Sequence, residues 1–235
     1  MLERKHETLE QDPFAAGDAD RFTARQGEVL AEALHLLVQG GERALTTAGL
    51  ARAANCSKES LYKWFGDRDS LLAAVVAYQA SKVRIEDAAP AGSRDEFRAR
   101  LVTFAEDLLT VLAGDTSLAL NRLAISHASR EGAPLGRLLL ERGRKRISAR
   151  AKALLEAGRR QRYLAFDDTE EAWQTLYGLI VGDLHGRLLL GDRPREDEAD
   201  FHMRSVAAID RFYRLHEAVI QSGVPSGSKE PPSAR

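Results

Sequence analysis

The stretch LTTAGLARAANCSKESLYKWFGDR, residues 45–68, decides the fold of the N-terminal region. Its pattern predicts two short helices joined by the turn Asn55-Cys56-Ser57. Such a sharp turn needs one residue with positive φ, which asparagine adopts most readily after glycine. We therefore expect Asn55 to end the first helix in the left-handed conformation. Ser57 is placed to cap the second helix, because its hydroxyl can accept a hydrogen bond from a free backbone N–H group.

The second short helix has two dissimilar faces. Leu61 and Phe65 lie four residues apart and are expected to pack inward, together with Leu50 and Ala54. The other side chains are expected to face outward fully or in part: Lys58, Glu59, Ser60, Tyr62, Lys63 and Trp64. Cations and hydroxyls bind phosphates, and residues near a helix N-terminus reach base edges in the major groove. The pattern predicts a DNA-binding helix-turn-helix. A three-helix packing unit without a DNA role is disfavoured, because residues 62–65 cannot all face one core.

The net charge of the helix-turn-helix segment supports DNA binding, whereas the net charge of the whole chain does not. The chain has 235 residues and a formal net charge of -1, so its total charge does not indicate nucleic-acid binding. Between residues 52 and 68, however, four basic side chains stand against two acidic ones, a net of +2. The single cysteine, Cys56, excludes an internal disulfide framework and a multi-cysteine zinc site. We expect Cys56 to point inward as a small hydrophobic residue.

The rest of the chain is predicted to be helical and to form a larger bundle. Apolar residues recur at helical spacing, and capping signals punctuate them. Two of the expected helices are long, one running from residue 134 to about 158 and one from 168 or 169 to about 190. We predict an all-α protein with a helix-turn-helix domain at 21–66 and an effector-binding and dimerisation domain at 67–220. Residues 1–20 and 221–235 are predicted to be a disordered arm and a disordered tail.

Residues 45–76, LTTAGLARAANCSKESLYKWFGDRDSLLAAVV, resemble the DNA-binding domain of the TetR/AcrR family of transcription regulators. The matching elements are the threonine pair at the start, the turn ending in Ser57, the motif Ser60-Leu61-Tyr62-x-x-Phe65-Gly66, and the basic Arg68. The resemblance implies that Lys58, Glu59 and Ser60 contact bases. It implies contacts with the DNA backbone for Thr47, Tyr62, Lys63, Trp64 and Arg68.

Two positions depart from the family's pattern. Asn55-Cys56 stands where Gly-Val is usual, and Glu59 stands where a small residue or proline is common. A carboxylate repels phosphate, so Glu59 is either a reader of the cytosine amino group or a simple helix former.

The second domain resembles the AefR-like variant of the family's C-terminal domain, from residue 118 to 190. This resemblance implies a dimerising helical domain that responds to a small molecule, without naming that molecule. Inward positions on the middle helices are the candidate effector contacts: Phe104, Leu108, Asn121, His127, Trp173 and Tyr177. Each of them could equally be a plain core residue.

Three glycines indicate a dimer interface. Gly178, Gly182 and Gly186 recur every four residues along one expected helix, although each costs about 1 kcal/mol relative to alanine there. A row of small residues lets another backbone approach, so we expect this helix and the last predicted helix, from about Asp197 to Ile220, to pair with their copies. Close packing within one subunit is the alternative. The basic stretch 134–162 is expected to be a solvated face, with a second nucleic-acid surface or an anionic effector site as the alternative.

The sequence predicts a homodimeric, cytoplasmic repressor that a small-molecule effector releases from double-stranded operator DNA. It contains no Walker-type loop, no G-x-S-x-G and no H-E-x-x-H motif, so we expect no enzyme activity and no cofactor. No histidine pair has metal-ligand spacing with a third ligand nearby, so no metal site is expected. No apolar run is long enough to cross a bilayer, and the N-terminus lacks a secretory signal. Two rivals remain: an activator or partner-gated regulator, and an enzyme or carrier with an incidental helix-turn-helix.

Overall fold

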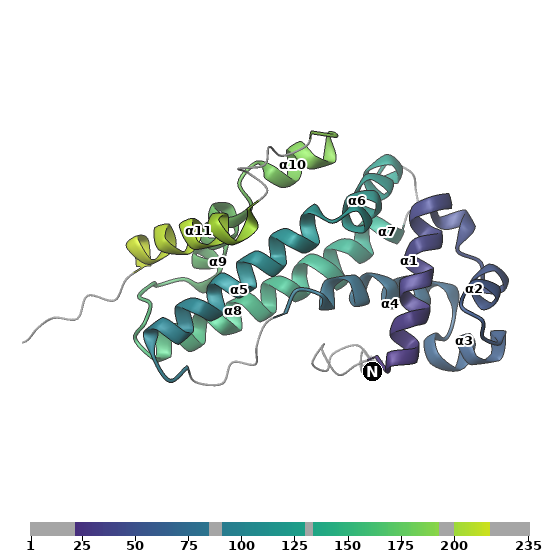
Figure 1. Ribbon diagram of the computed structural model, residues 1–235, viewed down its shortest axis with the longest axis horizontal. Helices are drawn as coiled ribbons and strands as arrows, with labels where there is room; N and C mark the ends of the chain where they lie inside the picture. Colours follow the sequence, from purple (N-terminus) through teal and green to yellow (C-terminus); the bar gives the residue numbers. More distant parts are fainter. Residues whose placement is uncertain (1–21, 85–90, 130–133, 193–199, 217–235) are drawn as a thin grey trace, which may run out of the picture.

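The computed structural model describes residues 22–84, 91–129, 134–192 and 200–216, which fold into helices joined by short connections (Figure 1). In chain order the helices are α1 Ala24–Ala44, α2 Thr47–Ala53, α3 Lys58–Phe65, α4 Arg68–Ser81, α5 Arg94–Ala113, α6 Asp115–His127, α7 Pro134–Leu138, a π-helical turn Leu139–Arg144, α8 Lys145–Arg160, α9 Thr169–Val181, α10 Leu184–Leu189 and α11 Phe201–His216. The all-α prediction is confirmed. The predicted arm at 1–20 and tail at 221–235 lie outside the described residues.

Helices α1, α2 and α3 form a small unit at one end of the molecule (Figure 1). Thr23 and Gln26 form the capping box of α1: the Thr23 hydroxyl accepts from the Gln26 N–H at 3.2 Å, and the Gln26 side chain accepts from the Thr23 N–H at 2.8 Å. Near the end of α1, Gly41 has a φ of 66°, a left-handed conformation that glycine adopts without steric cost. This kink turns the chain toward α2.

Helices α1, α2 and α3 share a hydrophobic core, the N-terminal core, and a second hydrophobic core joins α5, α8, α9 and α11. Phe97 and Phe104 of α5 are almost fully buried in it, as are Leu176 of α9 and Phe212 of α11. Figure 1 shows α11 at the end of the molecule opposite α2 and α3. There α11 packs against α5 and α9. This core is therefore remote from the N-terminal unit.

Helix α4 contributes to both cores. Leu71, Leu72 and Val75 pack with α1, α2 and α3, whereas Ala80 near its C-terminal end belongs to the core of the larger bundle. Nearly all of its apolar side chains are buried, so α4 is a rigid connection between the two units. The predicted domain boundary between residues 66 and 67 stays a prediction, since α4 belongs to both.

The expected single helix from 168 or 169 to about 190 is wrong. The structure ends α9 at Gly182, whose φ is 53°, and begins α10 at Leu184. Arg204 of α11 stabilises this break, because its guanidinium donates to the carbonyls of Ile180 and Val181, both at 2.9 Å. The last carbonyls of α9 thus find a partner outside the helix. The three glycines consequently do not lie along one continuous helix.

The expected helix from 134 to about 158 is also modified. A π-helical turn interrupts it at Leu139–Arg144 and packs against α4. Such turns contain one more residue than a regular helical turn and occur often at functional sites. Here the buried Gly143 lies against α4, and a Cβ atom at this position would be 3.8 Å from Val76 Cγ1.

Within the described parts of the chain, no helix taken alone has the length and hydropathy of a membrane span. The bent pair of α5 and α6, which meet at 59°, meets both criteria when the two are taken together.

Candidate nucleic-acid interface and ligand cavity

The turn between α2 and α3 has the predicted backbone. Asn55 has a φ of 48°, in the left-handed region, and the Cys56 N–H donates to the Ala51 carbonyl at 2.9 Å to close α2. Ser57 caps α3, since its hydroxyl accepts from the Ser60 N–H at 3.0 Å. Cys56 is only half-buried, although it packs against the N-terminal core as expected.

The inner face of α3 packs against the N-terminal core, and its outer face is exposed to solvent. Leu61 and Phe65 are buried in the N-terminal core, as predicted. Tyr62 is 58% exposed, and Lys63 beside it is also exposed. Trp64 is half-buried and meets Phe65 edge-on at 6.2 Å between ring centroids, so it serves the core as well as the surface. The outer face of α3 is therefore exposed to solvent.

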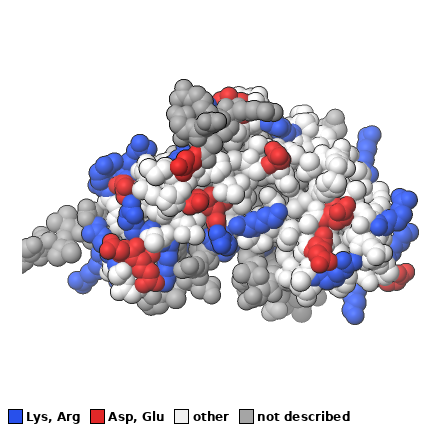
Figure 2. All heavy atoms as spheres, viewed as in Figure 1, with Lys and Arg blue, Asp and Glu red and all other residues white. Residues whose placement is uncertain are grey.

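The remaining predicted contact residues surround this face. Lys58 and Glu59 are exposed on the first turn of α3, and Ser60 is half-buried behind them. Thr47 opens α2 and is half-buried, while Arg68 is exposed at the start of α4. Figure 2 shows lysine and arginine side chains gathered at the end of the molecule where Figure 1 places α2 and α3. The helix dipole adds positive potential at the N-termini of α2, α3 and α4.

The carboxylate of Glu59 is engaged by its own helix. Its pKa is lowered by a hydrogen bond from the Glu59 backbone N–H, then by one from the Ser57 hydroxyl and by the nearby charge of Lys58. Asp67 plays a similar part in α4, where its side chain accepts from the Ser70 N–H at 2.8 Å and its pKa is lowered by that bond. Glu59 therefore has a local role at the start of its helix, which agrees with the helix-former alternative and leaves the cytosine-reading alternative a prediction.

Arg25 is a positioning residue that sequence reasoning missed. From the first turn of α1 its guanidinium donates to the carbonyls of Ala54 at 2.6 Å and Asn55 at 3.1 Å. Glu28, one turn along α1, holds the same guanidinium at 2.6 Å. The contact spans about thirty residues of sequence, so no local pattern could reveal it. It ties α1 to the turn that orients α3.

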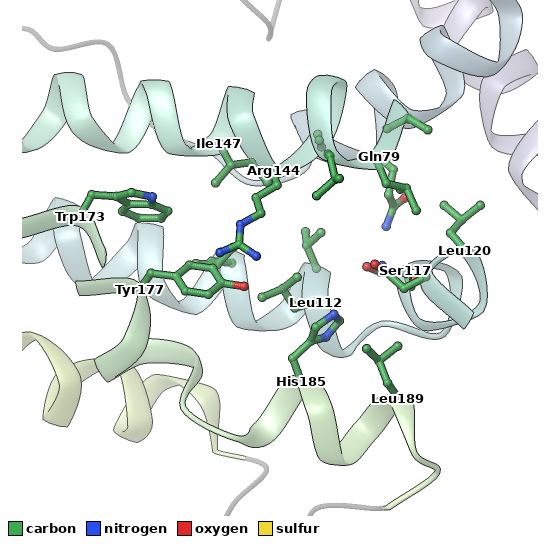
Figure 3. Close-up of a pocket in the computed structure, with 18 residues that line it drawn as sticks. Gln79, Leu112, Ser117, Leu120, Arg144, Ile147, Trp173, Tyr177, His185 and Leu189 are labelled. Carbon is green, nitrogen blue, oxygen red and sulfur yellow. Dashed lines mark hydrogen bonds between the residues drawn. The ribbon is translucent and has the colours of Figure 1, made fainter. Parts of the chain in front are cut away.

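A cavity of about 260 Å³ lies between α4, the π-helical turn and helices α5, α6, α8, α9 and α10 (Figure 3). Its walls are mostly apolar, with a few polar groups. The lining residues on which its chemistry depends are Gln79, Leu108, Ser117, Asn121, Arg144, Trp173, Tyr177 and His185. A concave, largely apolar space with a few polar groups is the usual form of a small-molecule site.

Four of the six predicted effector contacts line this cavity: Leu108, Asn121, Trp173 and Tyr177. Phe104 and His127 do not. Phe104 is only 1% exposed and packs behind Trp173, at 6.1 Å between ring centroids, while His127 is the last residue of α6. Periodicity identified the inward side of each helix, but it could not tell a residue that lines a cavity from one in the solid core.

One end of the cavity is aromatic. The rings of Trp173 and Tyr177 meet edge to face at 5.4 Å between centroids, and the Arg144 guanidinium lies over the Tyr177 ring at 5.1 Å (Figure 3). Burial raises the pKa of the Tyr177 phenol, and the charge of Arg144 opposes this shift. The Tyr177 phenol is therefore neutral at physiological pH.

Two buried polar groups in the cavity walls lack a partner among the described residues. Gln79 of α4 is only 8% exposed, and its Oε1 atom accepts no hydrogen bond from that part of the chain. His185 of α10 leaves its Nδ1 atom buried and equally unpaired. Burial lowers the pKa of His185, and a backbone hydrogen bond at Leu112 opposes that shift. Neither residue was singled out from the sequence, where nothing marks them as neighbours.

The glycines predicted to form a dimer interface differ in their surroundings. Gly178 and Gly186 are exposed, and no described atom lies within 4 Å of the position that a Cβ would take. At Gly182 a Cβ would lie 3.1 Å from Arg204 Nη2. Gly182 therefore serves the break between α9 and α10, whereas the other two leave backbone open on the surface.

Part of the basic stretch 134–162 is neutralised within the subunit. Lys152 pairs with Glu170 at 2.9 Å, and Arg159 pairs with Glu156 at 2.9 Å. These pairs favour the solvated-face interpretation over a second nucleic-acid surface. Nowhere in the described ranges do three or more histidine, cysteine, aspartate or glutamate side chains gather as they would around a metal ion.

Comparison with known families identifies both halves of the chain. Residues 29–75 match the family described as bacterial regulatory proteins, tetR family. Residues 99–218 match the family described as the AefR-like transcriptional repressor, C-terminal domain. Both resemblances stated from the sequence are thereby confirmed. No curated protein matches the chain.

Solved structures agree with this assignment. A TetR transcriptional regulator from Agrobacterium tumefaciens is 58% identical, with 84% of this chain and 97% of that one covered and a TM-score of 0.71. A putative TetR-family regulator from Mesorhizobium loti is 23% identical over 82% of this chain and 96% of that one, with a TM-score of 0.64, and shows the shared fold. A protein described as the flavonoid-responsive regulator FrrA is 25% identical over 82% of this chain and 97% of that one, with a TM-score of 0.59.

Proposed function

The chain belongs to the TetR family of DNA-binding transcription regulators, and from this premise we propose that it is a repressor released from its operator by a small molecule. The observation that carries the proposal is the combination of an outward-facing α3 with a cavity whose wall includes α4. A protein of this kind works on DNA in the cytoplasm. It needs no catalytic group and no cofactor.

We assign the DNA contacts by position on the exposed face. Lys58, Glu59 and Ser60 lie on the first turn of α3, the part of a recognition helix that reaches base edges. Thr47, Tyr62, Lys63, Trp64 and Arg68 surround them, at positions suited to phosphates. Support comes from the exposure of Tyr62, Lys63 and Arg68, whose hydroxyl and cationic groups are of the kinds that bind phosphates.

The effector is proposed to act through α4. Val76 belongs to the N-terminal core and also lines the cavity, one turn before Gln79 and Ala80. A molecule in the cavity that binds one position of α4 better than another shifts the protein toward that position. Since Leu71 and Leu72 of the same helix pack against the DNA-binding unit, the shift changes how α3 is presented.

We further propose a homodimer that pairs through the face carrying Gly178 and Gly186. Support comes from the open backbone at both glycines and from two exposed apolar side chains, Leu190 at 91% directly after α10 and Met203 at 61% on α11. Two-fold pairing would place two α3 helices about one turn of DNA apart, or a simple multiple of it. Gly178→Trp is expected to shift the species seen by light scattering from dimer to monomer. Gly136→Trp on α7, where a side chain also meets open space, is the control.

The function is tested by gel shift with the DNA upstream of the protein's own gene. Wild-type protein is expected to bind it specifically and with strong salt dependence. Lys63→Ala should weaken binding to all sequences and reduce the salt slope by about 0.9, the effect of one lost phosphate contact. Lys58→Ala should instead relax preference at particular base pairs.

Lys152→Ala, on α8 and paired with Glu170, controls for the loss of a cation elsewhere. Should both α3 variants bind as the Lys152 control does, the placement of α3 on DNA is wrong. Release is tested separately, by whether a compound that raises the melting temperature also dissociates the complex.

A further inference from the structure

The cavity of the proposed effector site restricts what kind of molecule can occupy it. We propose that the effector is a neutral phenolic compound of one or two aromatic rings, whose hydroxyl groups form hydrogen bonds with His185 and the Gln79 carbonyl oxygen. This inference rests on the proposed function only in calling the ligand an effector. The binding itself follows from the shape and polarity of the cavity.

Size and wall chemistry point to an aromatic body. The volume of about 260 Å³ lies just below the usual range of ligand pockets, which favours a small molecule. The walls are formed largely by aliphatic side chains such as Leu108, Leu120 and Ile147. Trp173 and Tyr177 close one end, and their edge-to-face geometry provides a ring face on which a flat aromatic group can pack.

His185 offers a polar group to the ligand. Its ring lines the cavity, and its Nδ1 atom is buried without a partner among the described residues. Burial lowers the pKa of the ring, which favours the neutral imidazole. A ligand hydroxyl can pair with Nδ1 in either neutral tautomer, because a hydroxyl both donates and accepts hydrogen bonds.

Gln79 supplies a second polar anchor. Its side chain is more than nine-tenths buried, lines the cavity, and leaves its carbonyl oxygen without a donor in the described structure. A buried polar group without a partner destabilises the free protein, and a ligand hydroxyl can relieve this cost on binding. Figure 3 shows Gln79 and His185 projecting into the cavity from different helices, α4 and α10, so a ligand that uses both bridges the two.

Arg144 raises the question of an anionic ligand, but its environment argues against one. Arg144 is an exposed residue at the cavity wall, and its guanidinium lies over the Tyr177 ring. Because the residue is in contact with water, its charge is not that of a buried cation that needs a carboxylate partner. The unsatisfied groups inside are neutral, which favours a hydroxyl over an ionised acid.

The test is isothermal titration calorimetry of the full chain with three probes of one shape: biphenyl-4-ol, 4-methoxybiphenyl and biphenyl-4-carboxylate. We expect the phenol to bind at least roughly tenfold more tightly than the ether, since the ether accepts but cannot donate. His185→Phe and Gln79→Leu should each weaken phenol binding by roughly threefold to tenfold and leave ether binding unchanged.

His202→Phe on α11 and Gln39→Leu on α1 are matched controls, because both replace exposed side chains outside the cavity lining. Gln79→Leu should also raise the melting temperature of the free protein, because it removes a buried polar group without a partner, so a folding defect does not explain weaker binding.

Equal affinity for phenol and ether would overturn the proposal, as would tightest binding of the carboxylate or no binding of any probe. None of these measurements uses DNA. Phenol binding without specific operator binding would therefore refute the proposed function alone. Operator binding with no preference for the phenol would refute this inference alone.

Discussion

Replacing Asn55 tests whether the left-handed turn fixes α3. The residue has a φ of 48°, and its carbonyl accepts from Arg25 at 3.1 Å. Asn55→Gly keeps both the carbonyl and the conformation, because glycine adopts positive φ freely. Asn55→Val places a β-branched side chain in a region where its Cβ crowds the backbone. The two variants therefore separate the backbone requirement from the loss of the amide.

The expected magnitudes follow from this geometry. A left-handed residue with a Cβ costs about 1–2 kcal/mol, and asparagine already bears a smaller part of that cost. Valine should lower the free energy of unfolding by about 1–2 kcal/mol, which corresponds to about 2–8 °C in melting temperature for a chain of this length. Glycine relieves strain but gives the unfolded chain more freedom, so its net effect should stay within about 0.5 kcal/mol.

The assay is thermal unfolding followed by calorimetry, together with the gel shift described above. Because the turn sets the angle between α2 and α3, Asn55→Val should also weaken operator binding, by up to about tenfold, while Asn55→Gly should bind as wild type does. If valine and glycine variants melt together and bind alike, the turn does not depend on the left-handed conformation, and the reasoning is refuted.

Three further predictions concern other parts of the chain. Arg25→Ala should lower the free energy of unfolding, because two turn carbonyls lose their donor; the loss should be only about 1 kcal/mol, since the side chain is partly exposed. Arg25→Lys should recover part of this loss, as measured by chemical denaturation. Gly158→Ala should cost about 1–3 kcal/mol, since the new Cβ would lie 2.3 Å from Cζ of the buried Phe97, yet the folded protein should bind DNA unchanged. The free protein should lose stability as pH falls below about 6.5, because burial lowers the pKa of His185 and the unfolded chain therefore takes up the proton first. His185→Phe should flatten this part of the plot of stability against pH. An unchanged slope would argue against a buried neutral imidazole.

Local signals in the sequence were sufficient for the helix-turn-helix. Asn55, Ser57 and Asp67 act through backbone groups within four residues of themselves, so their roles can be read from the chain. The apolar spacing of Leu61 and Phe65 likewise identified the buried face of α3. The same local logic failed at Gly182, because the donor that stabilises the end of α9 is Arg204, from a different helix.

The residues that line the cavity could not all be predicted from local sequence patterns, for a related reason. Gln79 stands in the run Ala77-Tyr78-Gln79-Ala80, where a polar residue on a helix normally indicates the solvent side. It is buried although its own stretch of sequence gives no sign of this, because residues sixty or more positions later, in the π-helical turn, pack against α4.

The π-helical turn itself explains which basic residue reaches the cavity. One extra residue in a turn rotates everything that follows by about 100° relative to a regular α-helix. In the π-helical turn, which causes this rotation, Gly143 lies against Val76 and the adjacent Arg144 lies over the ring of Tyr177. Extrapolating the α-helical period of α8 backward through this segment assigns its residues to the wrong faces. The basic helix therefore looked like a uniformly solvated surface in the sequence, although one of its arginines forms part of the cavity wall.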